Sequence, residues 1–306
     1  MAAILDYLGY SIAGYTALTV FFYMLAYVLP KAAFVARALA SYFSLIASSV
    51  FGVGSSIILS LIGYGGMSQW AVGRSFKLFM KLSTGISFSI EDPKNYLNTV
   101  RPAVFIGNHQ TELDVLMLGS IFPKWCSVTA KSSLKNVPFL GWFMWLSGSI
   151  FIDRKNTKDA RQAMSGAATE IRDKKQSVYM FPEGTRSYSK EPELLPFKKG
   201  AFHLAVQAQV PIIPVVVANY SHILSVKDFV FRAGDVPCKV LDPISTKGLT
   251  SADVDELTRS TRELMLKELI ALTERARGQK ITSAPRTVSH TNGVIKASGS
   301  DMRVAA

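Results

Sequence analysis

The first part of the chain has long stretches without charge. From Tyr7 to Pro30 no residue is charged, and these 24 positions exceed the ~20 residues that a helix needs to cross the hydrocarbon core of a bilayer. The stretch therefore predicts a transmembrane helix. A cleaved signal peptide is the alternative, but no basic residue precedes the apolar run, and the run is too long for one.

A second uncharged stretch runs from Ala38 to Gly73, which is long for one crossing and short for two. It predicts one membrane helix near residues 40–62. Stripes of small residues in both segments would let the two helices pack closely. We expect a two-helix hairpin within residues 1–66, joined near residues 31–37; helices that simply tolerate small residues are the alternative. The small residues are Ser44, Ser48, Gly52, Ser56 and Ser60 in the second segment and Gly9, Ala13 and Ala17 in the first.

Residues 67–86 change character and predict an amphipathic helix. Three basic residues share one narrow face, and four apolar residues share the opposite one. Because the helix follows a membrane segment directly, we expect it to lie on the bilayer with its basic side in the cytosol. A surface helix of the following globular domain would show the same pattern. The basic residues are Arg74, Lys77 and Lys81, and the apolar ones are Val72, Phe76, Phe79 and Met80.

Residues 87–277 alternate between strand-like and helix-like patterns. Six short runs rich in β-branched or aromatic residues predict strands, and three amphipathic segments predict helices. Strands that alternate with helices predict an α/β fold, with a mainly parallel sheet flanked by helices. The strands are expected at 104–107, 127–130, 149–152, 178–181, 212–217 and 239–241, and the helices at 158–172, 197–209 and 254–277.

Two segments are less regular. Val137 to Ile152 is apolar, but its 16 residues are too few for a membrane crossing. We expect a buried helix and strand there, or a shallow membrane-contacting surface near Trp142 to Trp145. Residues 278–306 are polar and lack apolar periodicity, which predicts a disordered tail.

Charge and composition narrow the class of partner. The chain has 34 Lys and Arg against 22 Asp and Glu, a net charge of +12, which favours an anionic partner. Its hydrophobic content of 49% favours a membrane surface over nucleic acid, whose binding modules are normally polar. Cys126, Cys238 and four scattered histidines predict neither a disulfide framework nor a metal site. The low cysteine usage favours a reducing compartment.

The candidate chemistry begins at residues 104–114, VFIGNHQTELD. An apolar strand ends at Asn108 and His109, and Asp114 follows five positions after the histidine. Histidine titrates near neutral pH (~6.5), so an imidazole can accept a proton from a hydroxyl group while a carboxylate holds its tautomer. Because positions i and i+5 lie roughly 140° apart on a helix, we expect His109 in the turn after the strand and Asp114 one turn into the next helix. A core histidine beside a helix cap is the alternative.

Further turns place cations at the ends of predicted strands. In FPEGTR, residues 181–186, the glycine lets the backbone approach a ligand, the threonine offers a hydroxyl, and the arginine suits phosphate oxygens. Residues 148–154, GSIFIDR, end in Arg154, and Lys131 lies just past another strand. Loops at the carboxyl ends of strands bind ligands in α/β folds, so these cations predict an anion site. A surface loop with solvated cations is the alternative. Residues 210–215, VPIIPV, predict a buried strand rather than the lining of an acyl-chain groove.

The order of these motifs resembles a known family, the glycerolipid acyltransferases, which include the 1-acylglycerol-3-phosphate acyltransferases. The motifs are NHxxxxD, GxxFIDR, FPEGTR and VPIIPV, and the likeness looks closest to the fungal, endoplasmic-reticulum type. AKSSLKNVPFLGWFMWLSG at 130–148 and LPFKKGAFHLA at 195–205 are similar as well. The resemblance covers roughly residues 65–245, and it implies the acyltransferase fold for residues 87–277.

The resemblance implies transfer of an acyl chain from acyl-CoA to the sn-2 hydroxyl of lysophosphatidic acid, without a cofactor or metal. It also implies the endoplasmic-reticulum membrane, with the catalytic domain facing the cytosol, or a lipid droplet. His109 would be the general base and Asp114 its orienting partner. The phosphate and glycerol would be held by Glu183, Gly184, Thr185 and Arg186, with Arg154 in the same region and Asn108 as a positioning residue; Lys131 is a further candidate cation from its position alone.

Three other functions agree with parts of the pattern. The acceptor could be glycerol 3-phosphate or another lysophospholipid, which the motifs do not exclude. A serine hydrolase would also act on acyl groups, but the chain has no GxSxG nucleophile motif. A non-catalytic, membrane-anchored binder of anionic lipid would bind phospholipid without releasing CoA.

Overall fold

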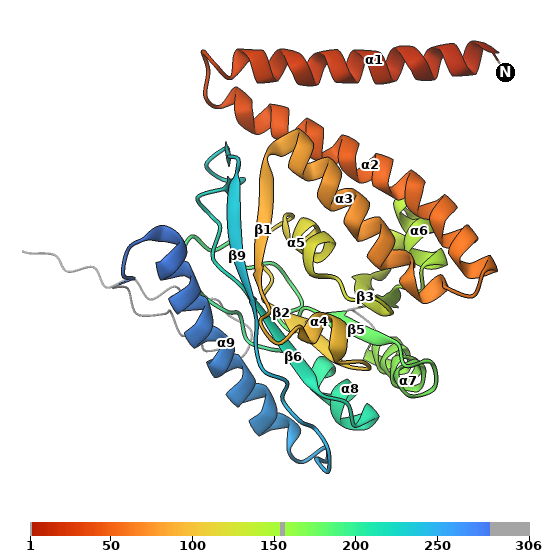
Figure 1. Ribbon diagram of the computed structural model, residues 1–306, viewed down its shortest axis with the longest axis vertical. Helices are drawn as coiled ribbons and strands as arrows, with labels where there is room; N and C mark the ends of the chain where they lie inside the picture. Colours follow the sequence, from red (N-terminus) through yellow and green to blue (C-terminus); the bar gives the residue numbers. More distant parts are fainter. Residues whose placement is uncertain (1, 154–156, 282–306) are drawn as a thin grey trace, which may run out of the picture.

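The computed structural model describes residues 2–153 and 157–281, which form an α/β domain preceded by two long helices (Figure 1). The main sheet has seven strands in the order β1-β9-β6-β2-β5-β3-β4. Only β1 and β9 run opposite to the other five. The predicted α/β fold with a mainly parallel sheet is therefore confirmed. The strands are β1 (Ile86–Glu91), β2 (Val104–Gly107), β3 (Cys126–Lys131), β4 (Ile150–Ile152), β5 (Ser177–Met180), β6 (Ile212–Val217) and β9 (Gly234–Val240), and a separate hairpin pairs β7 (Leu224–Ser225) with β8 (Val230–Phe231).

The central strands are apolar because helices cover both faces of the sheet. Every residue of β2 and β6 is buried, as continuous apolar runs in parallel sheets usually are. In register, Ile106 of β2 lies between Met180 of β5 and Pro214 of β6. This register brings the carboxyl ends of the three strands to one edge of the sheet, where the turns that follow them can meet.

Two hydrophobic cores lie on the two faces of the sheet. One joins the sheet to α3 and α5, and the other joins it to α7, α8 and α9. Figure 1 shows these two helical layers on either side of the strands. The helices of the domain are α3 (Ser68–Thr84), α4 (Tyr96–Thr99), α5 (Asp114–Ile121), α6 (Leu140–Leu146), α7 (Thr157–Lys174), α8 (Gly200–Ala208) and α9 (Val254–Arg277), with short 3₁₀ turns at Gly65–Met67 and Ser132–Asn136.

All six predicted strands and all three predicted helices are present. The hydrophobic pattern did not predict β1 or the β7–β8 hairpin, and it placed the start of β9 five residues too late. Residues 137–152 do contain a helix and a strand, α6 and β4. Trp142 and Trp145 of α6 are 52% and 63% exposed, so this helix also presents an apolar surface.

The two N-terminal helices are α1 (Ala2–Leu25) and α2 (Ala32–Leu61), and both are long and apolar enough to be candidate membrane spans. The expected connection near residues 31–37 is wrong, because α2 already begins at Ala32. Arg37 lies inside α2, where its guanidinium donates hydrogen bonds to the carbonyls of Thr84 (3.0 Å) and Phe231 (3.1 Å). An internal charge is tolerated there because the folded domain supplies acceptors for it.

The stripe of small residues on α2 faces the domain rather than α1. Ser44, Ser48, Gly52 and Ser56 are buried, and Ser44 lies 3.2 Å from Ser83 of α3 through their hydroxyl oxygens. Figure 1 shows α2 running along α3 and α6. The expectation that this stripe packs on the first helix is therefore wrong. Helix α1 instead contacts α2 through larger side chains, such as that of Tyr15, whose hydroxyl donates to the Leu39 carbonyl at 2.7 Å.

Helix α3 was expected to lie on the bilayer, but Val72, Phe76 and Met80 are buried in the protein. The interfacial interpretation of these three side chains is wrong, and the surface-helix alternative describes them better. Arg74 on the other face donates hydrogen bonds to the Gly119 and Ser120 carbonyls at the end of α5. Such cationic caps stabilise the carboxyl end of a helix, so α3 fixes the helix that carries Asp114. The polar tail expected at 278–306 lies outside the described residues from 282 onward.

The contact of α2 with the domain gives a testable pair of glycine variants. A Cβ at Gly52 would come within 2.7 Å of the Phe143 ring, whereas one at Gly54 would meet nothing within 4 Å. We expect Gly52→Ala to lower the free energy of unfolding by about 1–3 kcal/mol through overpacking. Gly54→Ala should be neutral or stabilising by up to about 1 kcal/mol, because alanine favours the helix.

Thermal unfolding of the two variants in the same detergent, followed by circular dichroism, measures the difference. Equal unfolding temperatures would show that α2 does not pack on α6 through Gly52.

Candidate active site

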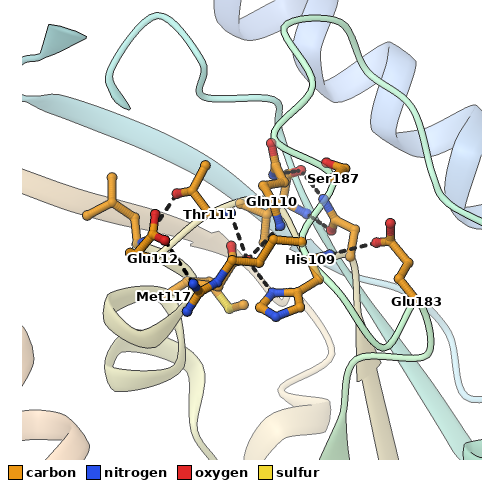
Figure 2. Close-up of polar contacts among 12 residues, drawn as sticks. His109, Gln110, Thr111, Glu112, Met117, Glu183 and Ser187 are labelled. Carbon is orange, nitrogen blue, oxygen red and sulfur yellow. Dashed lines mark hydrogen bonds and ion pairs between the residues drawn. The ribbon is translucent and has the colours of Figure 1, made fainter. Parts of the chain in front are cut away.

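His109 and Asp114 meet where strand β2 gives way to helix α5. β2 ends at Gly107, His109 lies in the following turn, and Asp114 is the first residue of α5 rather than one turn into it. The ring nitrogen Nδ1 of His109 lies 2.6 Å from Oδ2 of Asp114. Figure 2 shows His109 between Thr111 and Glu112 on one side and Glu183 on the other. The structure thus brings together the pair that the sequence predicted.

The Asp114 carboxylate is buried and accepts hydrogen bonds from several directions. Its side chain is 1% exposed, and Oδ2 also accepts the backbone N–H groups of Gln110 (2.6 Å) and Thr111 (3.2 Å). Its place at the start of α5 adds the favourable field of the helix N-terminus. These groups replace the water that a buried carboxylate loses.

Tyr220 is a site residue that the sequence analysis missed. Its hydroxyl donates a hydrogen bond to Oδ1 of Asp114 at 2.6 Å and accepts one from the Thr111 backbone N–H at 3.1 Å. Burial, together with the nearby Asp114 charge, raises the pKa of Tyr220 well above its ordinary value. The hydroxyl therefore stays protonated and acts as the hydrogen-bond donor to Asp114.

The imidazole ring of His109 is held on a second side by an aromatic stack. The Phe181 ring lies 4.1 Å from it, centroid to centroid, at an angle of 16°. Within residues 2–153 and 157–281, no hydrogen bond reaches the other ring nitrogen, Nε2. A histidine that donates Nδ1–H to a carboxylate has its lone pair on Nε2, where it can accept a proton from a bound hydroxyl group.

Asn108 and Glu183 hold the backbone around His109. Asn108 is buried and bonds both backbone groups of Val217, at 3.0 and 2.9 Å, which ties the end of β2 to the end of β6 and agrees with a positioning role. Glu183 is 3% exposed, and its carboxylate accepts the backbone N–H groups of His109 (2.7 Å) and Leu195 (2.9 Å). Glu183 therefore holds the backbone on both sides of it, and the headgroup contact that the resemblance implied stays a prediction.

Burial dominates the ionisation of Glu183. Desolvation raises the pKa of Glu183 to about 8, although the two backbone N–H groups favour the ionised form and lower it in part. The folded protein therefore holds a proton on this carboxyl group at pH values where an unfolded chain would release it.

Gly184, Thr185 and Arg186 form the turn after β5. Gly184 has φ +70°, and a Cβ there would lie 2.9 Å from the Lys198 side chain, so the position favours glycine. Thr185 is exposed. Arg186 pairs with Glu112 at 2.8 Å, and the Tyr188 hydroxyl donates to the same carboxylate at 2.6 Å. The sequence motifs did not point to Glu112, Tyr188 or Lys198 as site residues.

Two predicted cations, Lys131 and Arg154, are not part of this turn. Lys131 is exposed at the end of β3, which is separated from β2 by β5. Arg154 lies outside the described residues. Within residues 2–153 and 157–281, no group of three or more His, Cys, Asp or Glu side chains could hold a metal ion.

Comparison with known proteins shows which family the sequence resembles. The profile of the Acyltransferase family matches residues 90–218, which contain His109, Asp114 and the turn after β5. The chain is 45% identical to the 1-acyl-sn-glycerol-3-phosphate acyltransferase of Saccharomyces cerevisiae over 219 residues, 72% of each protein. It is 40% identical to 1-acyl-sn-glycerol-3-phosphate acyltransferase beta of Homo sapiens over 207 residues, 68% of this chain and 69% of that protein.

A solved structure is similar in fold. It is the crystal structure of the 1-acyl-sn-glycerophosphate (LPA) acyltransferase PlsC from Thermotoga maritima, with a TM-score of 0.62 and 20% identity. The similarity covers 87% of this chain and 98% of that one. The arrangement of sheet and helices described above is therefore one already known from experiment.

The buried carboxyl group of Glu183 should make stability depend on pH. Because its pKa rises from 4.5 to about 8 on folding, the folded state binds the extra proton between these values. The free energy of unfolding should therefore fall as pH rises through this window, by up to about 1.4 kcal/mol per pH unit from this group. Glu183→Gln should remove that slope.

Denaturant unfolding at pH 5.5 and pH 8 measures the effect. The control is Glu191→Gln, which removes an exposed carboxylate paired with Arg277 and should leave the slope unchanged. An unaltered slope in Glu183→Gln would contradict a protonated Glu183.

Proposed function

Because this chain belongs to the family of the 1-acyl-sn-glycerol-3-phosphate acyltransferases, and is thus an acyltransferase of phospholipid biosynthesis, we propose its reaction in detail. It transfers an acyl chain from acyl-CoA to the sn-2 hydroxyl of 1-acyl-sn-glycerol 3-phosphate, giving phosphatidic acid and CoA. The observation that carries the proposal is the hydrogen bond between His109 Nδ1 and Asp114, which leaves Nε2 available to a substrate.

The chemical step is a direct transfer without a covalent enzyme intermediate. Nε2 of His109 removes the proton as the sn-2 hydroxyl oxygen attacks the thioester carbonyl carbon. The carbon–sulfur bond then breaks, and the CoA thiolate leaves and takes a proton from the imidazolium. Asp114 stabilises the imidazolium formed meanwhile. General-base catalysis of this kind is worth roughly 10² to 10⁴ in rate, and holding both substrates in place adds to it.

Arg186 is the first candidate for the phosphate group. Its guanidinium can give two parallel hydrogen bonds to phosphate oxygens. In the present structure Glu112 occupies one of its nitrogens, so a bound phosphate has to displace this carboxylate. Thr185 lies on the same turn, and the Lys198 side chain lies next to Gly184 of that turn. Arg154 and Lys131 remain candidates for phosphate binding from the sequence. No cofactor is required, because acyl-CoA is a second substrate.

The enzyme acts at a membrane surface. Two apolar N-terminal helices give it membrane association, and the acceptor in the names of its relatives is a lipid. We place it in the endoplasmic-reticulum membrane or on lipid droplets, with the catalytic domain facing the cytosol. Two unpaired, buried cysteines and a net charge of +12 support a reducing compartment and an anionic membrane surface.

A histidine substitution tests the proposed base. In purified protein with acyl-CoA and lysophosphatidic acid, we expect His109→Ala to lower kcat by about 10² to 10⁴, because this substitution removes the proposed base. His203→Ala, which removes an exposed histidine of α8, is the matched control. Release of the CoA thiol gives the rate, and repeating the assay with glycerol 3-phosphate or another lysophospholipid in place of lysophosphatidic acid gives the range of acceptors. Near-normal turnover by a folded His109→Ala protein would contradict the mechanism.

A tyrosine pair tests the support of Asp114. Tyr220→Phe should lower kcat about tenfold, which corresponds to about 1.4 kcal/mol in the transition state. It should also move the acidic limb of the pH–rate profile to higher pH, because Asp114 then directs more of its charge at the imidazolium. Tyr179→Phe is the control, since that hydroxyl is equally buried, but among the described residues its one hydrogen bond is to Met117 Sδ, at 3.9 Å. Identical profiles for the two variants would show that Tyr220 is merely structural.

A further inference from the structure

The β7–β8 hairpin exposes apolar side chains at its tip. Val226 is 46% exposed and Phe229 is 57% exposed, and both lie in the turn between the two strands. Phe229 also has φ +53°, a conformation that aromatic residues rarely adopt. A strained backbone that presents an aromatic ring to the surface indicates a functional contact at this position.

The hairpin is joined to the first turns of α2. The Phe34 ring packs against Phe229 at 5.4 Å and Phe231 at 6.2 Å, and Arg37 donates a hydrogen bond to the Phe231 carbonyl. The linker just before α2 is apolar and exposed as well, with Tyr27 at 93% and Val28 at 79%. The hairpin tip is therefore continuous with the apolar helices that give the protein its membrane association.

The other side of the hairpin borders the candidate active site. A pocket of about 270 Å³ is lined by Gln110 and Thr111, by residues 188–190 and by residues 224–227 of the hairpin. Gln110 and Thr111 directly follow His109. Lys190 is paired with Asp228 at 2.8 Å, and the Ser225 hydroxyl donates to the same carboxylate at 2.6 Å. The hairpin is thereby fastened to the segment that also carries Arg186.

We propose that the tip of the β7–β8 hairpin inserts into the headgroup region of the bilayer beside α2, and that the lipid acceptor passes from the bilayer to His109 along the adjoining pocket. The second half rests on the proposed function. Two exposed apolar side chains are too few for a protein interface, which needs about 800 Å² on each partner. They suffice for interfacial insertion next to a membrane helix, and the exposed Lys227 between them suits anionic headgroups.

Lipid contact can be measured at the hairpin itself. Cys126 and Cys238 are buried, so Phe229→Cys can be labelled selectively with an environment-sensitive fluorophore in the full-length protein. After reconstitution into phosphatidylcholine vesicles that contain phosphatidic acid, we expect spin-labelled lipid to quench the fluorophore and aqueous iodide to quench it poorly. The control is Leu264→Cys on α9, a residue 45% exposed, which should show the reverse. Iodide quenching at both positions, with no quenching by lipid, would overturn the insertion.

The route to His109 has its own test. Phe229→Asn removes the ring and still tolerates a positive φ, so the variant should fold. We expect its KM for long-chain lysophosphatidic acid in vesicles to rise several-fold with kcat unchanged. Its kinetics with a short-chain, water-soluble 1-acylglycerol 3-phosphate should be normal, and Phe229→Trp should behave as the wild type with both acceptors.

The outcomes separate the two claims. Equal effects of Phe229→Asn on the two acceptors, or none on either, would overturn the proposed route. Lipid quenching at position 229 in a protein that does not acylate lysophosphatidic acid would support the insertion and contradict the proposed function alone.

Discussion

The buried charge of Asp114 is the constraint on which the site depends. Burying a carboxylate that is 1% exposed is costly unless polar groups replace its water. Four groups do so here, at 2.6 to 3.2 Å: the His109 ring, the Gln110 and Thr111 amides and the Tyr220 hydroxyl. Three belong to the turn after β2, and the fourth follows β6. The parallel pairing of β2 with β6 is what places these two segments side by side.

The segment after β6 has a second neighbour, because it continues from Tyr220 into the hairpin that packs on α2. One stretch of chain thus connects Tyr220, the partner of Asp114, with α2, one of the two candidate membrane spans. β9 then returns antiparallel to β6, which leaves the carboxyl edge of the five parallel strands to the turns that carry His109 and Arg186. The proposed phosphate-binding turn and the proposed general base therefore lie at one edge of the sheet, after the neighbouring strands β5 and β2.

What the sequence could predict was local. His109 and Asp114 are five residues apart, and apolar runs next to Gly or Pro mark the strands that support them. The bonds made by Tyr220 and Glu183 join residues 106 and 74 positions apart, and their existence depends on strand register, which no short motif records. Glu183 sits inside a recognisable turn, yet only the fold shows that it binds backbone amides. Arg37 was expected in the connection between the two helices for a similar reason: the carbonyls that accept its hydrogen bonds lie 47 and 194 positions away.

The central claim is that Asp114 fixes the proton of His109 on Nδ1 and leaves Nε2 as the base. Nitrogen NMR of ¹⁵N-histidine-labelled protein measures this directly, and with four histidines in the chain a His109→Gln sample identifies the signal. At a pH where the ring is neutral, the account predicts a protonated Nδ1 and an unprotonated Nε2. A neutral ring that carries its proton on Nε2 would contradict it.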